Sequence, residues 1–520
     1  MTWGTRARQS TGARRGTRMI RRAAVVGAAL VLGAFQAWPA AAGAASITDT
    51  ITGPARQGRV LVVDDDHVQC PTARFDSMQA ALLAASDGDR VRVCAGLYRG
   101  PVTIDASVTV QGEIGAVASF DCLDPVPGVP DDLDPTRFAI IRPPLDQALD
   151  GPLVRIAADD VDVSGLVVER HRDPLVETPG PGISLYDAAI AVSDAWSRTR
   201  IHHDVVRSYD LGIELGAPDS RVDHNCLRDN DFALANQRYP LARARIDDNT
   251  TFGSLVRTFE IGWTFRGTSD VRVDHNTSVE DAALGAYWVE NGVRPQVVAN
   301  VVRAARVGVT LRVSSNGLVS ANDLRAGTGV ISTRNTGAVI ADNRIAVSAS
   351  GVALGGGNDG VAVVRNSVTG LPGAGTAGII LVPPAPAPVN RDIAIETNVV
   401  SGLHGAGGAG VTVSSGSVVT GSVVRANELR DNSGSGILVA RGVSGLVVSD
   451  NVASGNVRDG IRLEAGTSDN VLQDNEAMGN GTDARDESGV DAATLLNEWA
   501  RTTCVTDVPV GAICVAPAVG

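Results

Sequence analysis

The sequence predicts an all-β solenoid of parallel strands, and three observations lead to this prediction. Glycine accounts for 58 of the 520 residues, whereas aromatic residues make up only 4%, which is poor material for several conventional globular cores. From residue 159 onward a unit of about 25 residues recurs. Within the unit, alternate residues after a glycine are apolar, as in Gly-Val-Thr-Leu at 308–311, which indicates a strand with one buried face. Such units cannot bury that face alone, so they must stack.

Residues 1–45 are predicted to be a signal peptide. Residues 1–45 contain seven arginines, all before residue 23, and no acidic residue. The apolar stretch 23–35 that follows them is too short to span a bilayer. Small residues at 42–44 suit cleavage. We therefore expect a secreted, extracellular protein. No later apolar run approaches the length of a membrane span.

The remaining sequence divides into four parts. Residues 46–112 are expected to form an N-terminal cap and first coil, in which apolar residues at helical spacing between Phe75 and Ser86 predict a short helix that plugs the solenoid. Residues 113–158 are expected to hold an irregular insertion and early coils, 159–482 the solenoid repeats, and 483–520 the C-terminal cap.

Each repeat is centred on an Asn or Asp, with an apolar residue three positions before it and a polar turn after it. Asn tolerates the left-handed conformation of tight turns, and stacked Asn side chains can hydrogen-bond to one another. We therefore predict that these residues form one structural column. Its positions are 204, 225, 249, 276, 300, 322, 343, 366, 398, 427, 451 and 475.

Six cysteines in an exported chain predict disulfides. The simplest assignment pairs neighbours, Cys70 with Cys94 and Cys504 with Cys514. Cys122 and Cys226 are left over, and the sequence leaves open whether they pair or stay reduced.

The N-terminal run from Val63 to Tyr98, which includes Asp64-Asp65-Asp66 and Cys70-Pro71, resembles the first strand, capping helix and first coil of exported bacterial β-helix repeat proteins. The run from Asn497 to Cys514 resembles their C-terminal cap. With the Asn-centred repeat, residues 60–515 resemble the right-handed parallel β-helix proteins of the pectin-lyase-like superfamily. The resemblance implies a single right-handed parallel β-helix with a short N-terminal capping helix and a disulfide-closed C-terminal cap. That superfamily includes lyases, hydrolases, epimerases, esterases and non-catalytic surface proteins, so the resemblance implies no single chemistry.

Histidines and aromatic residues gather on the coils between residues 160 and 315, where we expect any functional site. Two positions before the Asn column stand His202, Asp223, Asp247 and Asp274, and one position before it stand His203, His224, Asp248 and His275. Residues of one column on adjacent strands start about 4.8 Å apart. The candidate catalytic residues are therefore His202, Asp223, His224, Asp247, Asp274 and His275.

Three hypotheses remain open for these columns. Two carboxylates could act as the acid and base of a glycoside hydrolase. Asp223, Asp247 and Asp274 could instead bind Ca²⁺ and support β-elimination on a uronic-acid polymer. The columns could also be a solvated polar surface without a role. Trp263 and Tyr287 are candidate substrate contacts, because outward aromatic rings can stack on sugars, although large aromatic residues in strands often lie in the core.

The sequence thus predicts a secreted, monomeric protein that binds or acts on an extracellular polysaccharide or another cell-surface component. If it is an enzyme, we expect a polysaccharide lyase or glycoside hydrolase, with Ca²⁺ as the only cofactor considered. The alternative is a non-catalytic extracellular structural or interaction protein. The formal net charge of −13 makes nucleic acid an unsuitable partner, because an acidic surface repels phosphates.

Overall fold

The computed structural model describes most of the chain from residue 58 onward. The described residues are 58–113, 122, 133–144, 151–170, 188–254, 256–262, 267–279, 284–372, 375, 377–382, 389–415, 417, 419–489 and 493–516. The predicted signal peptide and much of the predicted insertion at 113–158 lie outside them. Within this part of the chain, no helix is long and apolar enough to cross a membrane.

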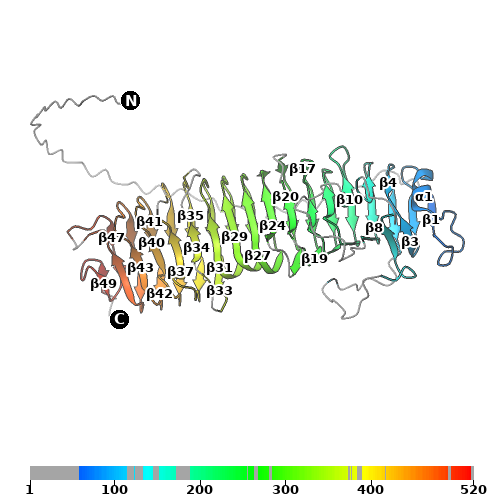
Figure 1. The fold of residues 1–520 in the computed structure, drawn as a ribbon. Helices are drawn as coiled ribbons and strands as arrows, with labels where there is room; N and C mark the ends of the chain where they lie inside the picture. The colour runs from blue at the N-terminus through cyan, green and yellow to red at the C-terminus, as the bar shows by residue number, and fades with distance from the viewer. Residues whose placement is uncertain are drawn as a thin grey trace, which may run out of the picture. The chain divides into compact units, whose positions relative to one another are not determined.

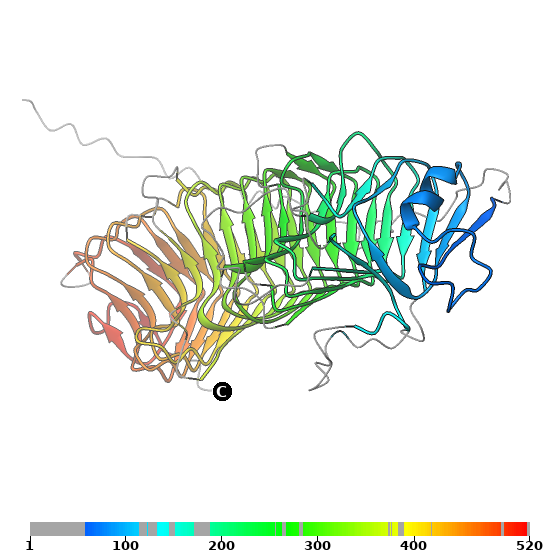
Figure 2. The ribbon, with the colours of Figure 1, turned by 45° about the vertical axis from the view of Figure 1, so that its right-hand side comes forward.

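Short strands stack along the chain into three faces, and every strand pairing among the described residues is parallel (Figures 1 and 2). The first face extends from β1 (Val60–Val63) to β47 (Glu498–Ala500). The second and third faces belong to one 30-stranded sheet, because strands such as β27 (Val301–Arg312) run through both. The prediction of an all-β parallel solenoid is confirmed.

The candidate functional residues lie on a few consecutive coils, whose strands are as follows. The first face contributes β8 (Asp162–Ser164), β11 (Arg200–His202), β14 (Arg221–Asp223), β18 (Arg245–Asp247), β22 (Arg272–Asp274) and β26 (Gln296–Val298). The second face contributes β9 (Val167–Glu169), β12 (Val205–Arg207), β15 (Cys226–Arg228), β19 (Thr250–Phe252), β23 (Thr277–Val279) and β27. The third face contributes β10 (Ala188–Val192), β13 (Leu211–Leu215), β16 (Phe232–Ala235), β20 (Arg257–Ile261), β24 (Gly285–Glu290) and β27.

Aliphatic side chains from the strand centres fill the interior. Ile201, Val222, Ile246 and Val273 lie in the middle of β11, β14, β18 and β22, and each is at most 1% exposed. The strand register places them directly above one another. Each coil therefore buries its apolar face against its neighbours, as the repeat requires.

One helix lies at the N-terminal end of the described residues. Helix α1 (Met78–Ala84) begins after Ser77, whose hydroxyl accepts a hydrogen bond from the backbone N–H of Ala80, and it buries Met78 and Leu82. It packs against β1 and β2 (Arg90–Val93). This helix falls within the range in which a helix was predicted, and its role as a plug for the solenoid stays a prediction.

The predicted Asn column is confirmed, and all twelve positions lie in one hydrogen-bonded stack. Asn300 is typical: its backbone N–H and its Nδ2 both donate to Oδ1 of Asn322, at 2.9 and 3.0 Å, and its Nδ2 also donates to the carbonyl of Val273 on the previous coil. The same backbone-to-side-chain bond joins every consecutive pair of positions from 204 to 475. The column therefore satisfies buried turn amides that no strand partner reaches.

Asp204 is the one acidic member of this column. It is 1% exposed, its Oδ1 accepts from the backbone N–H of Leu166 at 2.7 Å, and its Oδ2 has no hydrogen-bond partner. Burial raises the pKa of Asp204 well above its ordinary value. An Asn at this position would instead offer an Nδ2 donor, as the other members do.

We expect Asp204→Asn to stabilise the fold at neutral pH. The pKa of Asp204 is higher in the folded state than in the unfolded state, where it is ~4. Wild-type stability is therefore full below pH ~4. Above that pH the free energy of unfolding falls by up to about 1.4 kcal/mol per pH unit, until the pH passes the folded-state pKa. The variant does not titrate there. Its advantage in melting temperature should therefore be small at acidic pH and clear at neutral pH in calorimetric scans; an equal difference at both would contradict a raised pKa.

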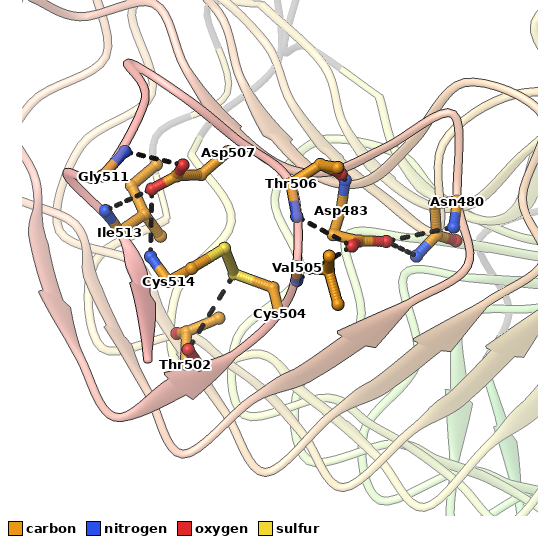
Figure 3. The surroundings of a disulfide bond; sticks show 10 residues. All are labelled: Asn480, Asp483, Thr502, Cys504, Val505, Thr506, Asp507, Gly511, Ile513 and Cys514. Atoms are coloured by element: carbon orange, nitrogen blue, oxygen red, sulfur yellow. Dashed lines mark hydrogen bonds between the residues drawn. A yellow bond between two sulfur atoms is a disulfide. The ribbon is translucent and has the colours of Figure 1, made fainter. Parts of the chain in front are cut away.

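Three disulfides are present. The two predicted local pairs, Cys70–Cys94 and Cys504–Cys514, form, and Cys122 and Cys226, whose state the sequence left open, form the third. At the C-terminal end, the carboxylate of Asp507 accepts hydrogen bonds from the backbone N–H groups of Gly511, Ile513 and Cys514 beside the Cys504–Cys514 bond (Figure 3). The disulfide therefore closes a loop that one buried carboxylate also holds.

Candidate functional site

The structure brings the predicted polar columns together. His202, Asp223, Asp247 and Asp274 are register partners at the ends of β11, β14, β18 and β22. Asp162 lies on the preceding strand, β8, and pairs in register with Arg200.

A column of arginines, absent from the predicted site, neutralises Asp223, Asp247 and Asp274. Strands β14, β18 and β22 have the pattern Arg-x-Asp, and β11 has Arg-x-His. The arginines of β11, β14 and β18 each reach the aspartate of the next coil through two hydrogen bonds. Arg221 donates from Nε and Nη2 to the two carboxylate oxygens of Asp247, at 2.9 and 2.7 Å. The equivalent pairs are Arg200 with Asp223 and Arg245 with Asp274. The aspartate side chains are fully buried, while the arginines are between 37 and 39% exposed.

The surroundings lower the pKa of two of the three carboxylates and raise that of the third. Burial raises the pKa of each, but for Asp223 the hydrogen bonds from Arg200 and His224 outweigh it, and the net shift is downward. The pKa of Asp274 is lowered in the same way by Arg245 and His275. Asp247 has no histidine neighbour, and burial leaves its pKa raised despite the hydrogen bonds from Arg221.

The three aspartates do not converge on one point. Among the described residues, sets of three acidic, His or Cys side chains with ligand atoms within 4.8 Å of one another occur at 64–66 and at Cys70, Cys94 and Glu113. Asp223, Asp247 and Asp274 do not form such a set, and their oxygens already accept arginine hydrogen bonds. Calcium binding at this column and a catalytic role for its acids stay predictions.

The histidines lie at the exposed edge of the same surface, in positions with left-handed backbone. His203, His224 and His275 have φ angles of 56, 55 and 57°, a conformation that His tolerates better than most side chains. Nδ1 of His224 lies 2.9 Å from Asp223, and Nδ1 of His275 lies 2.9 Å from Asp274. The rings of His203 and His224 stack, with centroids 4.9 Å apart.

Of the two predicted substrate contacts, the structure describes only Tyr287. The side chain of Tyr287 is 2% exposed and packs against Phe259 in the interior, with ring centroids 5.4 Å apart. Trp263 lies outside the described residues. The outward aromatic side chain of β24 is Trp288, the neighbour of Tyr287.

A second cluster of ionisable groups, missed from the sequence, lies on the outward side of the third face. Glu214 on β13, Ala235 on β16, Glu260 on β20 and Trp288 on β24 are successive register partners. Glu214 and Glu260 are each 1% exposed. Since Ala235 lies between them, two strand spacings separate their backbones, or about 9.6 Å.

Charged and aromatic groups surround Glu260. Arg257 donates a hydrogen bond to Glu260 from Nη1, and its guanidinium lies 4.0 Å from the centre of the Trp288 ring. Burial raises the pKa of Glu260 to about 7, with Arg257 and a hydrogen bond from Gln237 acting in the opposite direction. Glu260 is therefore both acid and base near neutral pH.

The segment after β16 covers both glutamates. Gln237 reaches Glu260, while Nε of Arg238 lies 3.5 Å from Oε1 of Glu214. Burial raises the pKa of Glu214 as well, against the effect of Arg238. One signal in the sequence could have revealed this cluster: the register partners Ala191, Ala235 and Thr310 of other coils are small, whereas Glu214 and Glu260 place acids in that column.

Family comparisons match two parts of the chain. Residues 388–498 match the family described as "Right handed beta helix region", and residues 197–371 match the family described as "Periplasmic copper-binding protein (NosD)". Each match spans less than half of the chain. No curated protein matches the sequence.

Several solved structures are similar to the chain in fold. The A-module of a mannuronan C-5 epimerase from Azotobacter vinelandii is 18% identical, with a TM-score of 0.37, over 66% of this chain and 94% of that one. The Dettilon tailspike protein is 13% identical, with a TM-score of 0.43, over 71% and 66%. The DFA-IIIase from Arthrobacter chlorophenolicus A6 is 14% identical, with a TM-score of 0.36, over 88% and 99%. At these identities the likeness concerns the fold and assigns no activity.

Proposed function

We propose that this right-handed parallel β-helix repeat protein is exported and hydrolyses an extracellular polysaccharide at the Glu214–Glu260 pair. The observation that carries the proposal is the raised pKa of Glu260, about 7, at an outward position of the sheet beside Trp288. A general acid works best when its pKa lies near the working pH. Export is supported by the three disulfides, which persist in oxidising compartments.

The two glutamates would share the work of an inverting hydrolase. In such enzymes one carboxylic acid protonates the leaving oxygen while a second carboxylate, ~6.5–9.5 Å away, activates a water. Two strand spacings place the backbones of Glu214 and Glu260 near the upper end of that range. Glu260, with the pKa near 7, would be the acid, and Glu214 the base; Trp288 would contact a sugar ring.

Substrate must reach two buried side chains. Gln237 and Arg238 contact the two glutamates from the segment that follows β16, so binding would have to displace this segment and expose the pair. Arg257 and Arg238 are each paired with a glutamate. A neutral polysaccharide therefore suits the site better than a uronic-acid polymer, whose carboxylates would need an arginine or a cation of their own.

Copper, which the NosD description names, prefers imidazole and sulfur ligands. Within the segment that matches this family, Nδ1 of His202 and Nδ1 of His203 lie 2.8 Å apart. The chain therefore has donors that fit this metal. No step of the proposed hydrolysis depends on it.

The test is a screen of the exported protein against neutral and uronic polysaccharides, with new reducing ends and the ultraviolet absorbance of unsaturated products as readouts. On a substrate that is cleaved, Glu260→Gln should lower kcat by about 100-fold or more, and wild-type activity should fall as the pH rises through 7. Glu214→Gln should abolish turnover with little effect on KM.

The matched control is Asp247→Asn, which alters the polar column and leaves the third face intact. If Asp247→Asn loses activity and Glu260→Gln keeps it, the catalytic residues are in the polar column instead. A folded protein that binds glycans without cleaving any of them would leave the non-catalytic interaction protein as the function.

A further inference from the structure

Residues 236–240 lie across the glutamate pair of the third face, and we call them the strap. Gln237 hydrogen-bonds to Glu260, and Arg238 contacts Glu214 through both its guanidinium and its backbone N–H. The two glutamates point outward from the sheet, yet each is only 1% exposed. The strap therefore helps to keep water from both carboxyl groups.

Both ends of the strap are attached to the solenoid. At one end, Asn236 is buried: its Oδ1 accepts from the backbone N–H of Gly262 at 2.6 Å, and its own N–H donates to the carbonyl of Glu260 at 3.2 Å. At the other end, the chain enters β17 (Leu241–Ala242) at Leu241, which is buried. Movement of the strap is therefore confined to the residues between these ends.

The middle of the strap rests on a glycine. Tyr239 packs over Gly216, where a Cβ would lie only 2.6 Å from the Cβ of Tyr239. Glycine permits this close approach because it has no side chain. Since residues 236–240 belong to no strand, the middle can lift without breaking a strand pairing.

Burial dominates the titration of both carboxyl groups. It raises the pKa of Glu260 to about 7, supported by the charge of Glu290 and opposed by Arg257 and by the hydrogen bond from the strap. It also raises the pKa of Glu214, against the effect of Arg238. When the strap lifts, water reaches the carboxyl groups, and their pKa values fall toward the ordinary value of ~4.3.

We propose that the strap is a pH-controlled lid, which closes over Glu214 and Glu260 while they are protonated and lifts when they ionise. The closed state holds protons more tightly than the open state. Closure is therefore most favourable below the open-state pKa and loses this advantage as the pH rises through the closed-state pKa. The hydrogen bonds from the strap to the ionised carboxylates reduce the effect without reversing it, because both net pKa shifts are upward.

The regulation that this lid provides rests on the proposed hydrolysis. Below pH ~7 Glu260 carries the proton that a leaving oxygen needs, but the strap covers it. Above pH ~7 the pair is open to substrate, but the acid is ionised. Hydrolysis is therefore fastest near pH ~7, where the open state and the protonated acid are both populated.

The experiment measures hydrogen exchange of the strap amides in the full chain at pH ~5.5 and pH ~8.5 by mass spectrometry. Each rate is divided by that of an unstructured peptide at the same pH, so that the remaining difference reports opening of the strap. In wild type, the protection of the amides at 237–239 should fall by about 10-fold or more between the two pH values. In the matched control, the double variant Glu214→Gln with Glu260→Gln, neither side chain titrates, and the protection should be equal at both.

A second variant, Gly216→Ala, places a methyl group against Tyr239 and should lower the protection at both pH values while the dependence on pH remains. Equal protection of the wild-type strap at both pH values would overturn the proposal. The same decrease in the double variant would also overturn it, because another group would then control the strap. Melting scans establish that each variant is folded. No polysaccharide takes part in the measurement, so a screen that finds no hydrolysis contradicts the proposed function and leaves the result for the strap standing.

Discussion

Asn322→Ala is expected to lower the free energy of unfolding by about 3 kcal/mol. Oδ1 of Asn322 accepts from both the backbone N–H and Nδ2 of Asn300, and its Nδ2 donates to the carbonyl of Val297 and to Asn343. The residue is 1% exposed, so water cannot replace these partners. Each buried group left without a partner costs about 1–3 kcal/mol. Chemical denaturation of wild type and variant measures the difference.

The control for this prediction is Asp359→Ala. Asp359 is an exposed residue beside Asn358, and its backbone forms parallel bridges to Thr336 and Arg391 that a side-chain substitution keeps. Its substitution should therefore change stability by less than about 0.5 kcal/mol. Because stacked repeats need not unfold in one step, the midpoint and the slope of the transition are both compared. Equal midpoints for Asn322→Ala and Asp359→Ala would show that the column contributes little to stability.

The Asn column could be predicted because its cause is local. Every copy carries an apolar residue three positions earlier and a turn afterwards, so the sequence repeats wherever the same turn must be closed. Parallel stacking then places equivalent positions of successive repeats above one another, independent of the length of the loops between them. The pairing of Cys122 with Cys226 depends on the path of the insertion, which no repeat governs, and it therefore remained open.

No sequence repeat marks the Glu214–Glu260 cluster as one marks the Asn column. Its partners come from three strands and from the segment after β16, and they meet only because coils of different lengths keep the same register. From the sequence alone, neither the burial of Glu260 nor the contact of Arg257 with Trp288 could be inferred. Those two facts determine the pKa, and hence the chemistry.

The hypothesis of calcium binding rests on the aspartates alone, and the arginines two positions before Asp223, Asp247 and Asp274 bear on it. In a strand, residues i and i+2 share a face, so the pattern Arg-x-Asp in β14, β18 and β22 places a cation beside each carboxylate. Arg221 and Arg245 each reach the aspartate of the next coil. Charge crowding is thereby relieved within the protein.

Arg221→Met is expected to destabilise the fold by about 3 kcal/mol at neutral pH. Asp247 is fully buried whereas Arg221 is 37% exposed. Removing the arginine leaves the buried charge without compensation, which costs about 3–5 kcal/mol where both partners are buried and less where one reaches solvent. Arg245, whose Nη2 lies 3.3 Å from Oδ2 of Asp247, compensates only in part. The pKa of Asp247 is already raised and should rise further in the variant. A group with a raised folded-state pKa contributes full stability below its unfolded value and loses it as the pH rises, so the defect should shrink toward pH ~4.

The double variant Arg221→Met with Asp247→Leu separates charge from packing, because it removes both partners and should recover most of the lost stability. Calorimetric scans of wild type, Arg221→Met and the double variant across pH and across a calcium series give both readouts. We expect calcium to leave the wild-type melting temperature unchanged, since arginine already occupies the carboxylate oxygens. If calcium raises that temperature and Asp247→Asn abolishes the increase, the aspartate column binds the ion, and the arginine pairs must open to admit it.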